Sequence, residues 1–325
     1  MKKLFIMMLV MSFLLINVGE TFAKKYTIGT VVKLVGHSWF ERMRGGVDKF
    51  AKDTGHETLF LGPPKASPAG QVKIIESLIA KGVDAICVVP FAPESLEMVL
   101  KKAMDKGIVV ISHEASNQQN VHYDIEPFDN AAYGSHLMDH LAGYMNAEGE
   151  YAVFVGSLVS KTHNEWVDAA VARQKAEYPK MMLVTDKIQE YDDQKVAYQK
   201  TKALLKKYPN LKGLQGSAMS TVPGAARAVQ EKKLHDKVAV VGTGLVSVTK
   251  RYLESGAAKL ISFWDPADAG YVMNKLAVMV LEGREITDGI DIGVPGYTKI
   301  QKEGKVLYGS GWIDVTKKNV ADYNF

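Results

Sequence analysis

The chain has 325 residues, 47% of them hydrophobic, and a formal net charge of only +4 at pH 7. The charged residues do not gather into runs of five or more of one sign, so nothing in the sequence suggests nucleic acid or an acidic surface as a partner. The single cysteine, Cys87, excludes an internal disulfide and a cysteine-based metal centre, and its apolar neighbours predict a buried small side chain. A chain of this length can bury a core without disulfides, and two lobes are expected rather than one.

Residues 1–23 have the pattern of a secretory signal. Lys2 and Lys3 precede an almost uninterrupted apolar run over 4–16, and Thr21-Phe22-Ala23 forms a small-x-small cleavage site. The alternative is an uncleaved membrane anchor, but the run is shorter than the roughly 20 apolar residues that span a bilayer. We expect removal of 1–23. Because no cysteine follows the run for lipid attachment, an outer membrane would have to retain the exported chain, which favours the periplasm.

From residue 24, short β-branched runs alternate with longer amphipathic stretches. Strands are predicted at 27–32, 58–61, 83–89 and 108–112, and helices at 40–50, 71–80 and 95–106. Gly55, Gly82 and Gly107 follow these helices and are typical of helix ends. Strands that alternate with helices of this length predict parallel pairing with right-handed crossovers.

The alternation restarts after an extended piece at 123–130. Helices are predicted at 130–145, 164–178, 194–208, 222–232, 246–255 and 267–281, and strands at 151–156, 182–188, 211–215, 237–242 and 259–263. The turn-rich remainder from 283 suits a segment that crosses back between lobes. The predicted fold class is α/β, with two doubly wound parallel-sheet lobes on a multi-crossing hinge. The N-terminal lobe is assigned to 24–125 plus 267–293, and the C-terminal lobe to 126–266 plus 294–325.

The ends of the predicted strands carry the candidate ligand-binding residues. Ligands of open α/β sheets bind beyond the carboxyl ends of the strands. Aromatic and hydrogen-bonding side chains gather there, which suits the apolar C–H faces and directional hydroxyls of a sugar. Taken singly, each tryptophan could instead be buried packing, and Lys33 could be a surface charge. The candidates are Lys33, His37, Trp39, Phe40, Phe91, His113, Glu114, Thr162, His163, Asn164, Trp166, Tyr191, Ser217, Met219, Thr243 and Asp265.

Motifs for catalysis and metal binding are weak. Gly242 and Gly244 begin like a dinucleotide fingerprint but lack its third glycine, so we interpret them as a turn. His136 and His140 lie four apart on a predicted helix; without a third ligand nearby in sequence, they are interpreted as surface or packing residues. Glu114 beside His113 could be an acid/base pair, but no nucleophile signature accompanies it. We therefore predict no catalytic residue, no metal, no cofactor and no enzyme activity.

The strand-end pieces, taken together, resemble a known family. They are Lys33-Leu34-Val35-Gly36 with Phe40, Gly62-Pro63-Pro64, Gly70-Gln71-Val72, Lys102-Ala103-Met104, Asn164-Glu165-Trp166, Val222-Pro223, Trp264-Asp265 and the closing residues 318–325. With them, the chain resembles the sugar-binding proteins of ribose-type ABC importers, and within these the rhamnose and autoinducer-2 binding proteins. The resemblance covers essentially the whole mature chain.

The resemblance implies a type I two-lobe fold with three hinge crossings, and a periplasmic receptor that hands its ligand to an importer permease. In autoinducer-2 receptors, a lysine and an aspartate at the positions of Lys33 and Asp265 contact the ligand, and another aspartate becomes Glu114 here. Their Asp-Gln pair falls on Thr162-His163, and their Pro-x-Ala segment falls on Ser217-Ala218-Met219. These differences favour a monosaccharide, deoxysugar or sugar alcohol over autoinducer-2.

Other functions stay open at this point. An autoinducer-2 receptor for uptake or chemotaxis is the first alternative, and docking on a chemoreceptor could accompany transport. A transcriptional regulator would need a DNA-binding headpiece, but a signal occupies 1–23. An exported sugar-acting enzyme is the remaining class. The expected partners are the ligand and the permease, with no nucleic acid, and the chain is expected to be a monomer.

Overall fold

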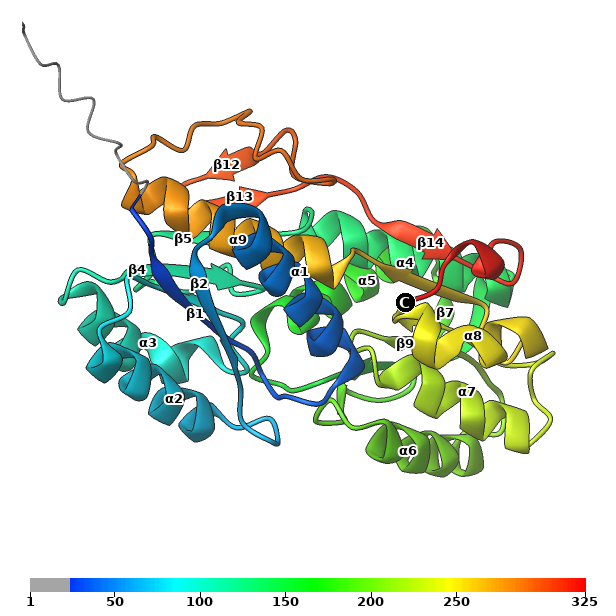
Figure 1. Cartoon of the computed structure of the whole chain (residues 1–325). Coiled ribbons are helices and arrows are strands. Elements are labelled where there is room, and N and C mark those ends of the chain that lie inside the picture. Colours follow the sequence, from blue (N-terminus) through cyan, green and yellow to red (C-terminus); the bar gives the residue numbers. More distant parts are fainter. Residues whose placement is uncertain (1–23) are drawn as a thin grey trace, which may run out of the picture.

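The computed structural model describes residues 24–325 (Figure 1). The predicted signal over 1–23 and its cleavage site lie outside the described residues. Within 24–325, no helix is long and apolar enough to cross a membrane. The described chain forms two α/β lobes that lie side by side, as Figure 1 shows.

The first lobe is built on one mixed sheet with the strand order β12-β13-β5-β4-β3-β1-β2. All neighbours are parallel except β12 and β13, which form an antiparallel hairpin at the edge. The central strands are buried on both faces, because helices cover the sheet on each side. The strands are β1 (Thr27–Val31), β2 (Glu57–Leu61), β3 (Ala85–Val88), β4 (Val109–His113), β5 (Tyr123–Glu126), β12 (Gln301–Glu303) and β13 (Val306–Tyr308).

The helices of the first lobe are α1 (Ser38–Thr54), α2 (Pro68–Lys81), α3 (Pro93–Met104) and α9 (Pro266–Leu281). Helices α2 and α3 pack together on one face of the sheet, and α1 and α9 pack together on the other (Figure 1). Proline in the first turn starts α2, α3 and α9 without losing a hydrogen bond. Gly55 and Gly82 end α1 and α2 in the left-handed conformation, as predicted.

The second lobe has a sheet of order β14-β11-β10-β9-β6-β7, and β8 also pairs with β6. Helices α4 and α5 pack together on one face, and α6, α7 and α8 lie on the other (Figure 1). The strands are β6 (Glu148–Val155), β7 (Lys180–Leu183), β8 (Ile188–Gln189), β9 (Leu211–Gly216), β10 (Ala239–Thr243), β11 (Leu260–Phe263) and β14 (Ile313–Val315). The helices are α4 (Asn130–Met145), α5 (Lys161–Glu177), α6 (Gln194–Lys207), α7 (Thr221–Glu231), α8 (Val246–Ser255) and the 3-10 helix η1 (Val320–Asp322).

Two expectations from the sequence differ from the structure. The single strand predicted at 182–188 is two short strands, β7 and β8, which pair with different parts of β6. The boundary predicted at 294 is incorrect for residues 301–308, because β13 pairs with β5 in the first sheet. Such short strands carry little periodicity of their own, and a partner distant in sequence decides which sheet they join.

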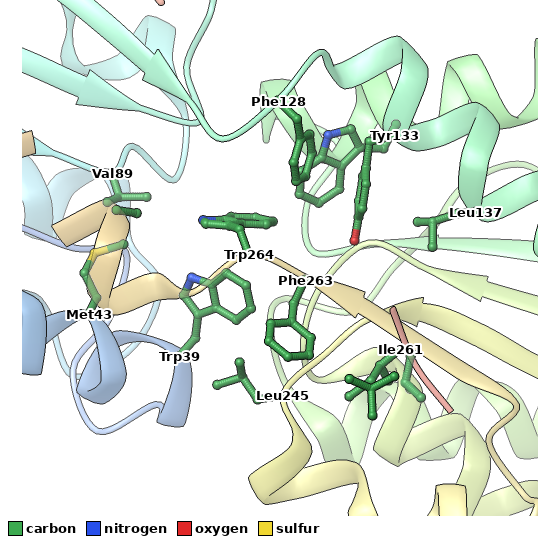
Figure 2. Close-up of a cluster of buried hydrophobic side chains, with 14 of the residues drawn as sticks. Trp39, Met43, Val89, Phe128, Tyr133, Leu137, Leu245, Ile261, Phe263 and Trp264 are labelled. Carbon is green, nitrogen blue, oxygen red and sulfur yellow. The ribbon is translucent and has the colours of Figure 1, made fainter. Parts of the chain in front are cut away.

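The chain crosses between the lobes three times within the described residues: between β5 and α4, between β11 and α9, and between β13 and β14. One large apolar core continues from lobe to lobe through this region. Figure 2 shows Trp264, from the second crossing, between Trp39 of α1 and Phe128 of the first crossing. A second core of buried side chains lies between the first sheet and α2 and α3.

Candidate functional site

A small cavity lies between the lobes beside the hinge. Ten of the predicted site residues line it, together with Asp192 and Trp264. The first lobe provides Lys33, His37, Trp39, Phe40 and Glu114, the second lobe provides His163, Trp166, Asp192, Ser217, Met219 and Thr243, and the second crossing provides Trp264.

Backbone topology explains why these residues meet. In parallel sheets the carboxyl ends of all strands lie along one edge, and the helices that follow begin there. Lys33 follows β1 and Glu114 follows β4, whereas Trp39 lies in the first turn of α1. In the second lobe, Ser217 directly follows β9 and Thr243 ends β10. The carboxyl edges of the two sheets therefore face each other across the cavity.

A buried ion pair lies on the first-lobe wall. Lys33 Nζ donates to Glu114 Oε2 at 2.6 Å, and the two side chains are each only 5% exposed. Burial opposes both charges, but the mutual attraction outweighs it, so the pKa of Lys33 is raised and that of Glu114 is lowered. Glu114 has a φ of 58°, a conformation that costs energy for a residue other than glycine and is enriched at functional sites. Both charges are thus held in place before a ligand binds.

The second-lobe wall adds an acidic group and a neutral histidine. Burial and the charge of Glu114 raise the pKa of Asp192, although Lys33 partly opposes this. Burial and the Lys33 charge lower the pKa of His163 to about 3, and its Nδ1 accepts the Gly156 N–H at 3.2 Å. The same causes lower the pKa of His37 to about 4. At neutral pH both histidines are uncharged, so each ring offers one donor and one acceptor.

The aromatic residues of the cavity form a connected cluster. Trp264 contacts Trp39 edge-on, with ring centroids 4.6 Å apart, and contacts Trp166 at 5.7 Å. Trp166 is fixed by a hydrogen bond from its Nε1 to Asn130 Oδ1 at 2.7 Å. Edge-to-face packing leaves the rings rigid and their faces apolar. The cavity therefore combines fixed apolar walls with charged and polar groups.

Several buried polar atoms of the cavity residues have no hydrogen-bond partner among residues 24–325. They are both ring nitrogens of His37, Asp192 Oδ2 and Trp264 Nε1. An unpaired buried polar atom costs about 1–3 kcal/mol. Donors and acceptors from a polar ligand would offset this cost.

Five other predicted site residues do not line the cavity. His113 is fully buried behind Glu114, with Nδ1 2.6 Å from Ile125 O, and Thr162 donates to Glu126 at 3.2 Å. The Asn164 side chain donates to the backbone carbonyls of Ser157 and Ser160, and the Phe91 N–H donates to Gln71 Oε1 at 2.9 Å. Tyr191 is 54% exposed on an outer surface. Neighbouring residues in a loop point in different directions. Position at a strand end therefore does not by itself tell which residues line the cavity and which do not.

Asp265, which the resemblance implies as a ligand contact, lies at the hinge and does not line the cavity. Its carboxylate caps α9 by accepting the Ala267 N–H at 2.8 Å, and it pairs with Arg42, whose Nε lies 2.9 Å from Oδ1. It lines two other hollows at the hinge instead. Because Asp265 lies in the second crossing and Arg42 belongs to α1, this pair ties the crossing to the first lobe.

Sequence reasoning missed Asp192 and passed over Trp264 as a site residue. The signal for Asp192 was present, since it is a carboxylate next to Tyr191 at a strand end. Both residues have a left-handed backbone, with φ of 59° and 55°. That turn directs Asp192 to the cavity and leaves Tyr191 exposed, which residue type alone does not predict.

The lobes meet around the cavity through direct contacts. Ser160 Oγ donates to Phe91 O at 3.2 Å, and Ser116 Oγ donates to Glu165 Oε1 at 3.1 Å. Each bond joins one lobe to the other. The structure is therefore in a closed arrangement in which both walls can touch one small ligand.

His163 gives this site a measurable pH dependence. An unfolded chain protonates histidine near a pKa of about 6.5, whereas the folded value is about 3. Between these values only the unfolded state binds the proton, so the folded state loses stability as pH falls. When the pH falls from 7.5 to 5, the free energy of unfolding should decrease in both proteins. We expect the decrease in the His163→Gln variant to be about 2 kcal/mol smaller than in the unmodified chain. Urea titrations at both pH values measure this.

The control for this experiment is His235→Gln, because His235 lies on the surface with its side chain 39% exposed. It should follow the pH dependence of the unmodified chain. Equal losses in the His163→Gln variant and the unmodified chain would contradict a buried neutral His163.

Comparisons with known proteins identify the family and the fold. Residues 28–285 match the periplasmic binding protein domain family. The D-allose-binding periplasmic protein of Escherichia coli (strain K12) is 26% identical over 275 residues, which cover 82% of this chain and 87% of that protein.

Two solved structures have the same fold. LsrB from Clostridium saccharobutylicum in complex with AI-2 superposes with a TM-score of 0.84 at 20% identity, covering 92% of this chain and 100% of that one. An ABC transporter solute-binding protein from Clostridium phytofermentas with bound L-rhamnose superposes with a TM-score of 0.84 at 21% identity, covering 93% of this chain and 99% of that one. The predicted α/β fold and the predicted kinship with sugar-importer solute-binding proteins are confirmed. The chain belongs to the periplasmic binding protein domain family.

Proposed function

We propose that this chain binds one small, uncharged, polyhydroxylated ligand between its lobes in the periplasm and delivers it to the permease of an ABC importer. The ligand class is a monosaccharide, deoxysugar or sugar alcohol. The observation that carries the proposal is a set of buried polar atoms on His37, Asp192 and Trp264 that have no partner among residues 24–325 and that belong to residues lining an aromatic cavity.

The charge of the cavity favours a neutral ligand. Lys33 is compensated by Glu114 at 2.6 Å, Asp192 adds acidic character, and both histidines are neutral. A phosphate would meet carboxylates, and the described residues that line the cavity offer no cation free of a carboxylate to balance it. Sugar hydroxyls, which donate and accept, can satisfy carboxylate, ammonium and imidazole groups together.

The mechanism is a shift between open and closed lobes. A ligand that contacts Lys33 and Glu114 on one wall and Asp192 and His163 on the other gains its full contacts only after closure. Such a ligand stabilises the closed state by its differential affinity. The three crossings let the lobes rotate as units, which is the usual hinge geometry. The permease would then recognise the closed pair of lobes and open it.

The experiment is a thermal-shift and calorimetric screen of the mature chain across sugars, deoxysugars, polyols and autoinducer-2, with Asp192→Asn beside it. Ligand binding should raise Tm by mass action. Loss of a charged hydrogen bond should weaken binding by about 1.5–3 kcal/mol, a ~10- to 150-fold higher Kd. The fold should be unaffected or more stable, because burial disfavours the Asp192 charge.

Asp186→Asn is the matched control, since Asp186 is exposed in the same lobe. Its Kd should equal that of the unmodified chain. An unchanged Kd in Asp192→Asn would place the ligand elsewhere. Turnover of a bound sugar by the purified chain would favour an exported enzyme instead of a transport receptor.

Autoinducer-2 is the second candidate, because the buried Lys33 occupies the position of a ligand-contacting lysine in the receptors that the sequence resembles. Against it, Asp265 is engaged by Arg42 and the α9 cap instead of the cavity. The screen decides between the two candidates, because the sugar proposal requires that a sugar or polyol binds with a lower Kd than autoinducer-2. The proposal also includes docking of the loaded chain on a chemoreceptor. We further propose that the chain is a monomer, which light scattering with and without ligand tests.

A further inference from the structure

A second cluster of polar side chains lies on the second lobe, apart from the sugar cavity. His136 and His140 are one turn apart on α4, with ring centroids 4.5 Å apart. Asp314 of β14 meets both: its oxygens lie 2.9 and 3.0 Å from His136 Nε2, and its Oδ2 lies 3.3 Å from His140 Nε2. One ligand atom from each residue lies within 4.8 Å of the others.

The three side chains have the composition of a transition-metal site. Two imidazole nitrogens and one carboxylate oxygen bind zinc at about 2.0–2.2 Å, which places tetrahedral ligand atoms roughly 3.3 Å apart. The observed separations of 2.9–3.3 Å around Asp314 are close to this spacing. The side chains are 22%, 35% and 30% exposed, so an ion can enter and a water can take the fourth position.

The His136 ring is also held in place by an aromatic neighbour. Trp312, from the third crossing, packs on the His136 ring with centroids 4.7 Å apart. Asp314 follows two residues later, and α4 begins directly after the first crossing. An ion bound here would join the beginning of the second lobe to its late edge strand, beside two of the hinge crossings.

We propose that His136, His140 and Asp314 form a binding site for one divalent transition-metal ion of the zinc type. The third ligand is 178 residues from His136, which is why the sequence alone favoured a surface or packing role for the two histidines. Imidazole ligands select zinc, nickel and copper over magnesium and calcium. Binding stabilises the second lobe, because the site exists only when α4 and β14 are folded together.

The test is calorimetry and thermal unfolding of the tag-free mature chain with ZnCl₂, NiCl₂, MgCl₂ and CaCl₂ in a non-chelating buffer. One zinc per chain should bind with a micromolar or tighter Kd and raise Tm, and magnesium and calcium should do neither. His140→Ala and Asp314→Asn should each weaken zinc at least ~10-fold. Affinity should also fall as pH drops, because protons compete for imidazole.

His235→Ala is the matched control, because His235 also lies beside an aspartate on the surface, 3.6 Å from Asp236. Its zinc affinity should be unchanged. Sugar binding by every variant reports that the chain is folded, and it tests the proposed function separately. No zinc binding at submillimolar metal, or equal zinc affinity in His140→Ala, Asp314→Asn and the unmodified chain, would overturn the metal site and leave the sugar proposal intact.

Discussion

Replacing Lys33 by methionine is expected to lower the free energy of unfolding by about 3–5 kcal/mol at neutral pH. Methionine fills a similar volume but removes the ammonium that lies 2.6 Å from Glu114. Glu114 is then a buried carboxylate with no cation beside it, since its side chain is only 5% exposed. Ligand affinity should fall as well, because Lys33 lines the cavity.

The double variant Lys33→Met/Glu114→Gln separates the stability lost with the ion pair from the stability lost with side-chain packing. Both charges are gone, so most of the stability should return, as buried ion pairs can often be replaced by neutral groups. Urea unfolding followed by tryptophan fluorescence measures all three proteins. The deficit of the single variant should shrink at acidic pH, where Glu114 takes up a proton. A single variant within about 1 kcal/mol of the unmodified chain would contradict a buried pair.

The second large effect is expected from Gly46→Ala in α1. A Cβ on Gly46 would lie 1.8 Å from the carbonyl oxygen of Ala267 and 2.5 Å from its carbonyl carbon. These are backbone atoms of α9, which cannot rotate away, so the two helices must separate. Overpacking of this kind costs about 1–3 kcal/mol or more, and we expect the upper end.

Gly45→Ala is an internal control one residue earlier. A Cβ there meets nothing within 4 Å. Because alanine is the better helix former, this variant should gain about 0.5–1 kcal/mol. Thermal and urea unfolding of both variants measure the contrast. Sugar affinity should fall only in Gly46→Ala, since Ala267 lies just after the hinge residue Asp265. Equal stabilities would mean that α1 and α9 do not pack this closely.

Local sequence determined the secondary structure and the class of fold. Alternating β-branched runs and amphipathic stretches, with Gly55 and Gly82 at helix ends, were sufficient to predict parallel sheets in two lobes. Parallel topology then brought the strand ends together, which is why Lys33, Glu114 and Thr243 were predicted as site residues and line the cavity. The reason is that periodicity and capping depend on residues close in sequence.

Tertiary structure alone decided which way individual side chains point and which distant segments pair. The turn at Tyr191 and Asp192 directs the carboxylate inward, Arg42 and the α9 cap hold Asp265 away from the cavity, and the pairing of β13 with β5 sets the last crossing. Asp314 reaches His136 across 178 residues of chain. Each of these depends on contacts between residues far apart in sequence, whose energies decide among orientations that local preferences leave nearly equal.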